Sequence, residues 1–153
     1  MGTTTIRLHS EPHFKERCLS SDDPGAPPRS ILLIEDNADA RDALRLLLEL
    51  DGHVVDAAGE GAEGVQIAQV KDPDIALVDI GLPGLDGYEV ARRLRASGSR
   101  RPVLVALTGY GQPEDRRRAV EAGFDALLVK PVDPSMLASL LTTLEIPGPG
   151  SRG

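Results

Sequence analysis

The chain has 153 residues and a formal net charge of -7, and its composition is 41% hydrophobic and 3% aromatic. This length fits one domain with a full aliphatic core and is too short for two domains of ordinary size. The negative charge argues against a chain that mainly neutralises the phosphates of nucleic acid. The single cysteine, Cys18, excludes an intramolecular disulfide and cannot form a zinc site alone. No apolar run approaches the roughly 20 residues that span a bilayer, so we expect a cytoplasmic domain without membrane contact.

The two ends of the chain differ in composition from the middle. Residues 1–29 show neither a helical nor a strand period, and residues 20–28 are rich in Ser, Asp, Pro and Gly. Such a composition is typical of linkers. The last seven residues, 147–153, are Pro, Gly and Ser with one Arg. We therefore predict a flexible leader or linker at 1–29, a folded domain at 30–146 and a disordered tail at 147–153.

Between these ends, apolar strand-like runs alternate with segments of helical period. In chain order, the pattern predicts strands at 31–34, 53–57, 75–79, 103–107 and 126–129, and helices at 38–50, 61–70, 88–96, 113–122 and 134–144. Asn37 or Asp39 can cap the first helix. Five strands that are each followed by a helix predict an α/β fold with a parallel sheet covered on both faces.

Four of the five predicted strands run into polar side chains. Because the carboxyl ends of parallel strands lie along one edge of the sheet, where open α/β sheets hold their sites, these groups are expected to converge. The strand that ends at Asp79 also runs directly into a turn containing Gly81 and Pro83. The converging groups are the carboxylates of Glu35, Asp36 and Asp79, the hydroxyl of Thr108 and the ammonium of Lys130.

Three ionised carboxylates in one crevice repel one another unless a cation joins them. Magnesium fits such a set because it takes oxygen ligands in octahedral geometry and keeps several waters. The residues therefore predict Mg2+ as the cofactor of this edge of the sheet.

In their order along successive strand–helix units, these residues resemble the phosphoacceptor receiver domain of two-component response regulators. The resemblance covers about residues 30–145 and includes the segments 79–87 and 122–125. It implies a flavodoxin-like (βα)5 doubly wound sheet with strand order 2-1-3-4-5. It also implies that Asp79 accepts a phosphoryl group from the phosphohistidine of a sensor histidine kinase or a histidine phosphotransfer protein. Such a domain catalyses only its own phosphorylation and dephosphorylation.

The resemblance assigns a role to each residue of the predicted site. Asp79 is the nucleophile, and Lys130 and Thr108 contact the phosphoryl group. Metal ligands are expected from Asp36 and Asp79, from Glu35 directly or through water, and from the backbone carbonyl of Gly81. The backbone N–H groups of Ile80, Gly81 and Gly109 are expected to contact phosphoryl oxygens.

A conformational switch is also implied. Thr108, Tyr110 and Leu127 occupy its positions, and reorientation of Thr108 is expected to repack the face built from residues 113–122, 126–129 and 134–144. Many relatives carry an aromatic ring or His where this chain has Leu127. The Lys130–Pro131 peptide is expected to be cis. The resemblance allows a phosphorylation-dependent dimer.

Other interpretations are weaker. Phosphatases of the haloacid dehalogenase type need a second Asp two residues after the nucleophile, where this chain has Gly81. A flavodoxin-type flavin carrier needs a hydroxyl-rich phosphate loop, where this chain has acidic residues after the first strand. A pseudo-receiver that binds partners without phosphorylation remains an alternative. The basic run 116–118 lies beside acidic residues and indicates a solvated helix face, so no nucleic acid partner is expected through this chain.

The leader suggests an origin. Residues 2–8 resemble the end of a histidine kinase ATP-binding domain, and 20–29 resembles the linker that precedes a receiver in hybrid kinases. We hypothesise that the chain is the C-terminal receiver of a hybrid sensor histidine kinase, in which case residues 1–29 are disordered. The alternative is a stand-alone single-domain response regulator.

Overall fold

The structure is a computed structural model that describes residues 5–7, 28–96, 101–109 and 111–146. Its strands are β1 (Thr5–Arg7), β2 (Ser30–Ile34), β3 (Val54–Ala58), β4 (Ile75–Asp79), β5 (Val103–Thr108) and β6 (Ala126–Val129). Its helices are α1 (Ala38–Leu50), α2 (Gly61–Lys71), α3 (Gly87–Arg95), α4 (Pro113–Ala122) and α5 (Pro134–Thr143). Within these ranges, no helix combines the length and the apolar character needed to cross a membrane.

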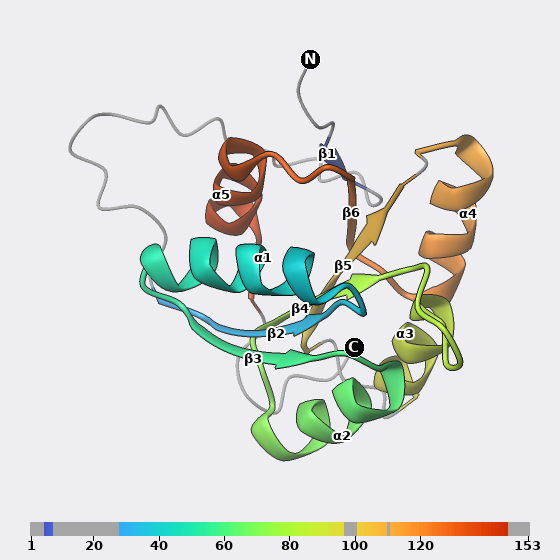
Figure 1. The fold of residues 1–153 in the computed structure, drawn as a ribbon. Coiled ribbons are helices and arrows are strands. Elements are labelled where there is room, and N and C mark those ends of the chain that lie inside the picture. The colour runs from blue at the N-terminus through green and yellow to red at the C-terminus, as the bar shows by residue number, and fades with distance from the viewer. Residues whose placement is uncertain (1–4, 8–27, 97–100, 110, 147–153) are drawn as a thin grey trace.

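The six strands form one sheet in the order β1-β6-β5-β4-β2-β3. The five predicted strands correspond to β2 through β6 and are mutually parallel, so their order is the predicted 2-1-3-4-5. Figure 1 shows the strands crossing the centre of the molecule with helices on both sides. The flavodoxin-like (βα)5 prediction is confirmed.

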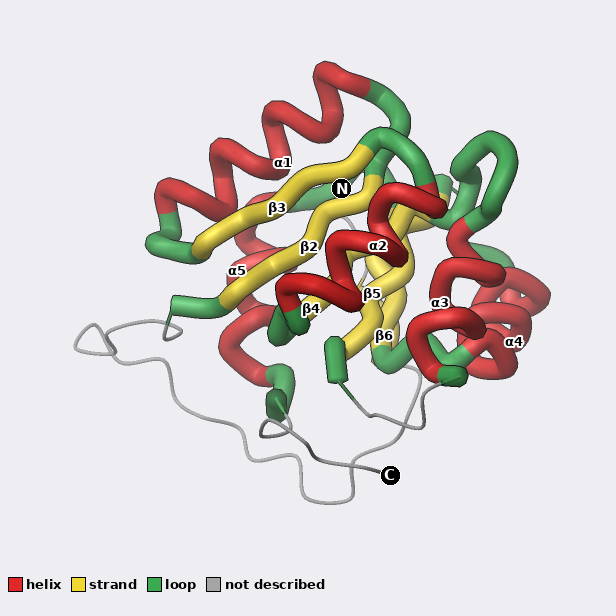
Figure 2. Tube along the Cα trace, turned by 90° about the horizontal axis from the view of Figure 1, so that it is seen from below, coloured by secondary structure: helices red, strands yellow, loops and turns green. Residues whose placement is uncertain are grey.

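Alternate residues of each central strand feed two separate cores. Leu32, Ala76 and Leu104 pack into the cluster beneath α2, α3 and α4, whereas Ile31 and Ile75 pack into the cluster beneath α1 and α5. Successive side chains of a strand point to opposite faces, so strands covered on both sides must be apolar at every position. Figures 1 and 2 show this division, with α1 and α5 on one face of the sheet and α2, α3 and α4 on the other.

Helix α1 begins and ends where the sequence predicts. The side chain of Asn37 accepts a hydrogen bond from the Ala40 N–H, so Asn37 is the N-cap. The buried face of α1 is formed by Leu44 and Leu48. Leu50 is 74% exposed, because it lies about 200° around the helix from Leu48 and so points away from the buried face.

Strand β1 was not predicted as part of the domain. Thr5–Arg7 were assigned to the flexible leader, but they pair antiparallel with Leu128, Leu127 and Ala126 of β6. The strand thereby covers the backbone of an edge that would otherwise be open, which physically favours the pairing. Leader residues 1–4 and 8–27 lie outside the described residues, as does the predicted tail at 147–153.

Two ion pairs tie the amino ends of the strands to neighbouring elements. Arg95 donates to Asp125 Oδ2 at 2.6 Å and to the carbonyl oxygens of Gly123 and Pro102 at 3.1 and 2.8 Å. Asp125 Oδ2 also accepts the Leu104 N–H at 2.8 Å. On the other side, Arg101 pairs with Asp74, whose second oxygen accepts the Ser30 N–H. These carboxylates satisfy backbone donors at the starts of β5 and β2.

We predict that Arg95→Ala lowers the free energy of unfolding by about 1–3 kcal/mol, because it removes the donors that hold Asp125 and two carbonyls. Arg92→Ala on the same helix is the control, since Arg92 forms only an exposed i,i+3 pair with Glu89. That change is expected to cost less than about 0.5 kcal/mol. Urea unfolding of both variants measures the difference, and equal losses would contradict this account of Arg95.

Candidate functional site

The predicted polar residues converge because their strands are neighbours in register. Glu35 follows β2, Asp79 ends β4, Thr108 ends β5 and Lys130 follows β6. In the sheet, Ile34 pairs with Val78, Asp79 with Leu107 and Thr108 with Val129. Each polar residue therefore lies within about one residue of the same level of the sheet, at its carboxyl edge.

Lys130 lies between two of the carboxylates. Its Nζ is 2.6 Å from Glu35 Oε1 and 3.2 Å from Asp79 Oδ2. The other oxygens are also engaged: Asp79 Oδ1 accepts the Gly81 N–H at 2.9 Å, and Glu35 Oε2 accepts the Asn37 N–H at 3.3 Å. Glu35 is 1% exposed and Asp79 is 6% exposed, so both acids are held in a largely dehydrated crevice.

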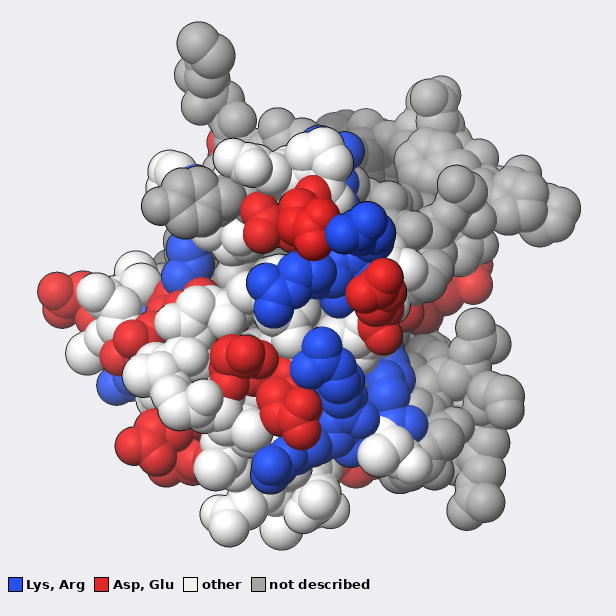
Figure 3. Space-filling model, turned by 90° about the vertical axis from the view of Figure 1, so that its right-hand side faces the viewer, with Lys and Arg blue, Asp and Glu red and all other residues white. Residues whose placement is uncertain are grey.

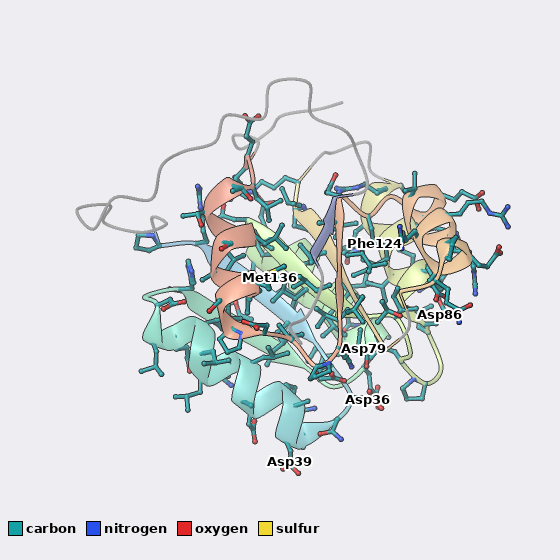
Figure 4. All side chains as sticks on the ribbon, turned by 90° about the horizontal axis from the view of Figure 1, so that it is seen from above. Asp36, Asp39, Asp79, Asp86, Phe124 and Met136 are labelled. Atoms are coloured by element: carbon teal, nitrogen blue, oxygen red, sulfur yellow. The ribbon has the colours of Figure 1, made fainter. Side chains whose placement is uncertain are left out.

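Asp36 completes the acidic cluster from the surface side. Oxygens of Glu35, Asp36 and Asp79 all lie within 4.8 Å of one another, and Asp36 is exposed. Figure 4 shows Asp36 and Asp79 next to each other at the edge of the sheet, whereas Asp39 and Asp86 lie away from them. Asp86 instead caps α3 by accepting the Glu89 N–H.

The pKa values of the two buried acids, Glu35 and Asp79, shift in opposite directions. Burial, together with the neighbouring Asp79, raises the pKa of Glu35 to about 7. Burial also acts to raise the pKa of Asp79, but hydrogen bonds from Glu35 and Gly81 and the charge of Lys130 outweigh it and leave this pKa lowered. The pKa of Lys130 is raised because Glu35 and Asp79 outweigh the effect of burial. Below pH about 7, Glu35 therefore carries a proton in preference to Asp79.

This arrangement predicts a pH dependence of stability in metal-free protein. The pKa of Glu35 is raised from 4.5 to about 7 on folding, so its protonation stabilises the fold fully below pH 4.5, and this contribution is lost as pH rises through about 7. The loss is on the order of 3 kcal/mol. Thermal or urea unfolding across this range measures it, with Glu35→Gln as the reference that cannot titrate.

The comparison with Glu35→Gln is needed because the pKa of His53 is lowered by burial and acts with the opposite sign in the same range. Wild type is expected to lose stability relative to Glu35→Gln between pH 4.5 and 7, and saturating Mg2+ is expected to reduce that loss. Parallel curves for the two proteins would show that Glu35 does not carry this proton.

The chemistry of the cluster fits a divalent cation. All three donors are carboxylate oxygens, the ligands that Mg2+ prefers, and one of them is exposed so that water can complete the coordination. Burial, with Asp79 close by, raises the pKa of Glu35, so the ionised form of this acid is unfavourable in the crevice unless a cation binds beside it. Glu35, Asp36 and Asp79 could thus hold a metal as the sequence predicted, and Gly81 follows Asp79 by two residues in the adjoining loop.

The three backbone N–H groups predicted to contact phosphoryl oxygens have different environments in the structure. The Ile80 N–H donates to the Leu107 carbonyl at 2.9 Å and so continues the sheet rather than pointing a free donor at the crevice. The Gly81 N–H faces Asp79 as expected, but it is engaged with Oδ1. Gly109 is exposed directly after β5. In this structure the Ile80 N–H is thus a backbone link between β4 and β5, and its contact with a phosphoryl oxygen stays a prediction.

The predicted switch residues are also placed. Thr108 is 5% exposed, and its carbonyl accepts the Lys130 N–H at 2.7 Å, which couples the ends of β5 and β6. Leu127 is completely buried in the core beneath α2, α3 and α4. Tyr110 lies outside the described residues. The Lys130–Pro131 peptide is cis, as predicted.

Sequence reasoning missed two residues that support the crevice. Arg41 Nη1 donates to the carbonyl of Glu35 at 2.9 Å from the first turn of α1. Gly87 packs so closely on the strand end that a Cβ there would lie 2.5 Å from the Asp79 carbonyl oxygen and 2.7 Å from Ile80 Cα. The turn sequence that contains Gly87 gave a signal for it, whereas no local pattern marks Arg41.

The basic run on α4 has local partners. Arg117 pairs with Glu114, Arg116 donates to the Gly111 carbonyl, and the Arg118 guanidinium lies 4.2 Å from the centre of the Tyr88 ring. Figure 3 shows basic and acidic side chains interspersed on this face of the molecule. The mixture of charges agrees with a solvated helix face.

Comparison with known proteins agrees with this geometry. The profile of the response regulator receiver domain matches residues 31–142, and the chain belongs to this family. It is 39% identical over 108 residues to the transcriptional regulatory protein AfsQ1 of Streptomyces coelicolor, a match that covers 71% of this chain and 47% of that protein. The chain thus spans about half the length of this relative.

Two solved structures are informative neighbours. The receiver domain of a Pseudomonas aeruginosa sensor histidine kinase, with magnesium coordinated in its active site cleft, matches with a TM-score of 0.69 and 33% identity over 75% of this chain and 95% of that one. A co-crystal structure of a Saccharomyces cerevisiae histidine phosphotransfer protein and the receiver domain of its downstream response regulator matches with a TM-score of 0.71 and 30% identity, covering 76% and 88% of the two chains.

Proposed function

We propose that this receiver domain accepts a phosphoryl group on Asp79 from the phosphohistidine of a sensor histidine kinase or a histidine phosphotransfer protein. The observation that carries the proposal is the position of Asp79. Its carboxylate lies at the carboxyl edge of the sheet, 3.2 Å from Lys130 Nζ and 2.9 Å from the Gly81 nitrogen, with two further carboxylates close by. The yeast phosphotransfer complex supports the class of donor.

In the proposed transfer, a carboxylate oxygen of Asp79 forms a bond to phosphorus as the bond between phosphorus and the histidine nitrogen breaks. The bonding electron pair stays on the imidazole, and the product is an acyl phosphate. Lys130, the Gly81 N–H and the Thr108 hydroxyl stabilise the negative charge on the phosphoryl oxygens. Mg2+ held by Glu35, Asp36 and Asp79 would supply charge neutralisation and orientation of the phosphoryl group.

Lys130 must change partners for this to happen. In the structure its ammonium lies closer to Glu35 Oε1 than to Asp79 Oδ2, at 2.6 against 3.2 Å. An incoming phosphoryl group and a divalent cation would replace these contacts, with the cation satisfying Glu35 and Lys130 turning to the phosphoryl oxygens. The domain on this proposal catalyses only its own phosphorylation and dephosphorylation.

The proposed output is a change in a protein-interaction face. The hydrogen bond from the Lys130 N–H to the Thr108 carbonyl joins the ends of β5 and β6. A shift of Thr108 would therefore displace β6 and alter the packing of α4 and α5. The proposal includes a cytoplasmic location and a protein partner or a second copy as the reader of that face.

The hybrid-kinase origin is not part of the proposal. It predicted disorder throughout residues 1–29, whereas Thr5–Arg7 pair with β6. The similar proteins include both a transcriptional regulatory protein and the receiver of a sensor kinase, so they do not separate the two origins.

Intact mass after incubation with Mg2+ and a small acyl phosphate tests the proposal. Wild type is expected to gain the mass of one phosphoryl group, and Asp79→Asn is expected to gain none while remaining folded, because the amide keeps the shape but is no nucleophile. Phosphorylation of Asp79→Asn would show that the acceptor is another residue. A wild type that binds Mg2+ but takes no phosphoryl group from either the small donor or a phosphohistidine protein would indicate a pseudo-receiver.

A further inference from the structure

The side chain of Arg41 extends from helix α1 to the end of strand β2, which Glu35 and Asp36 follow. Its Nη1 donates to the Glu35 carbonyl at 2.9 Å, in a partly buried position. The guanidinium passes over Gly59, where a Cβ would lie only 3.1 Å from Nη1. The absence of a side chain at residue 59 therefore leaves room for this approach.

The carbonyl that Arg41 holds belongs to the peptide that joins Glu35 to Asp36. The other backbone group of Glu35 is fixed as well, because its N–H donates to the Ala58 carbonyl at 3.0 Å. On the far side of Asp36, the Asn37 N–H donates to Glu35 Oε2, and the Asn37 carbonyl accepts the Arg41 N–H. Asp36 is thus an exposed residue whose two neighbours, Glu35 and Asn37, are both held by hydrogen bonds. Arg41 is the side chain that fixes the plane of the Glu35–Asp36 peptide.

We propose that Arg41 is a positioning residue that orients the Asp36 carboxylate for Mg2+ by clamping the Glu35–Asp36 peptide. The inference rests on the proposed metal-dependent function and adds a residue to its machinery. Partners that orient metal ligands from behind are worth on the order of tenfold or more in metal affinity. The side-chain hydrogen bond of Arg41 goes to a backbone carbonyl and not to a carboxylate of the cluster, so its effect passes through the backbone.

The charge of Arg41 and its clamping role predict opposite changes in Mg2+ affinity when Arg41 is replaced, so the direction of the change tests the inference. A cation near three carboxylates repels Mg2+, so removing its charge alone would tighten metal binding. Removing a clamp would weaken it, because Asp36 would have to be ordered when the metal binds.

The experiment measures Mg2+ affinity of the purified chain by calorimetric or NMR titration for wild type, Arg41→Gln and Arg41→Lys. Arg41→Gln is expected to weaken affinity on the order of tenfold. Arg41→Lys keeps the positive charge and one donor, and its Mg2+ affinity is expected to lie between those of wild type and Arg41→Gln. Arg45→Ala is the matched control, since Arg45 lies one turn along α1, pairs with exposed Glu49 at 3.6 Å and is expected to leave the affinity unchanged.

A second readout uses metal-free protein. Amide hydrogen exchange at Asp36 and Asn37 is expected to accelerate in Arg41→Gln while exchange in the central strands β2 and β4 and the unfolding free energy stay close to wild type. Affinity that is equal or tighter in Arg41→Gln, or unchanged exchange at Asp36, would overturn the inference. If Arg41→Gln fails to fold, Arg41→Lys decides by the same two measurements. Absence of Mg2+ binding by wild type would instead refute the metal assignment of the proposed function.

Discussion

Repulsion among three carboxylates is the constraint on which the site depends. Glu35 and Asp79 are nearly inaccessible to water, and Asp36 lies within 4.8 Å of both. In metal-free protein Lys130 bridges Glu35 and Asp79, and burial together with Asp79 raises the pKa of Glu35, so that this acid takes up a proton more readily. Both effects relieve the repulsion, and the pKa of Asp79 stays lowered. The same excess of negative charge creates the demand for a divalent cation.

The fold makes the repulsion unavoidable. Strands β2 and β4 are adjacent and in register, Glu35 follows β2 and Asp79 ends β4, so the sheet holds the backbones of the two acids at neighbouring positions. Gly87 also packs against the backbone of Asp79 and Ile80 with no room for a side chain. The stability of two cores, one on each face of the sheet, is what holds these charges together.

The two edges of the sheet illustrate different uses of carboxylates. At the carboxyl edge, acids are concentrated beyond what the local cations compensate. At the amino edge, Asp74 and Asp125 each bind one arginine and one backbone N–H, so their charge is satisfied within the fold. An aspartate beside a strand therefore becomes reactive or structural according to the partners that the neighbouring elements bring to it.

The sequence by itself determined the class of fold and the main site residues. Alternation of apolar runs with helical segments predicted every strand from β2 to β6. The runs of β2, β4, β5 and β6 are continuous because strands covered on both faces must be apolar throughout, whereas β3 is a partly exposed edge strand. The position of Glu35, Asp79, Thr108 and Lys130 at strand ends predicted that they converge, since parallel strands end at one edge. Only the tertiary structure decided the contacts that depend on residues far apart in the chain. These are the closer approach of Lys130 to Glu35 than to Asp79, the use of the Ile80 N–H in the sheet, the pairing of β1 with β6 and the reach of Arg41 across Gly59 to the Glu35 carbonyl. None of these has a local sequence signature, because each is fixed by how packed elements meet and not by the propensity of any one segment.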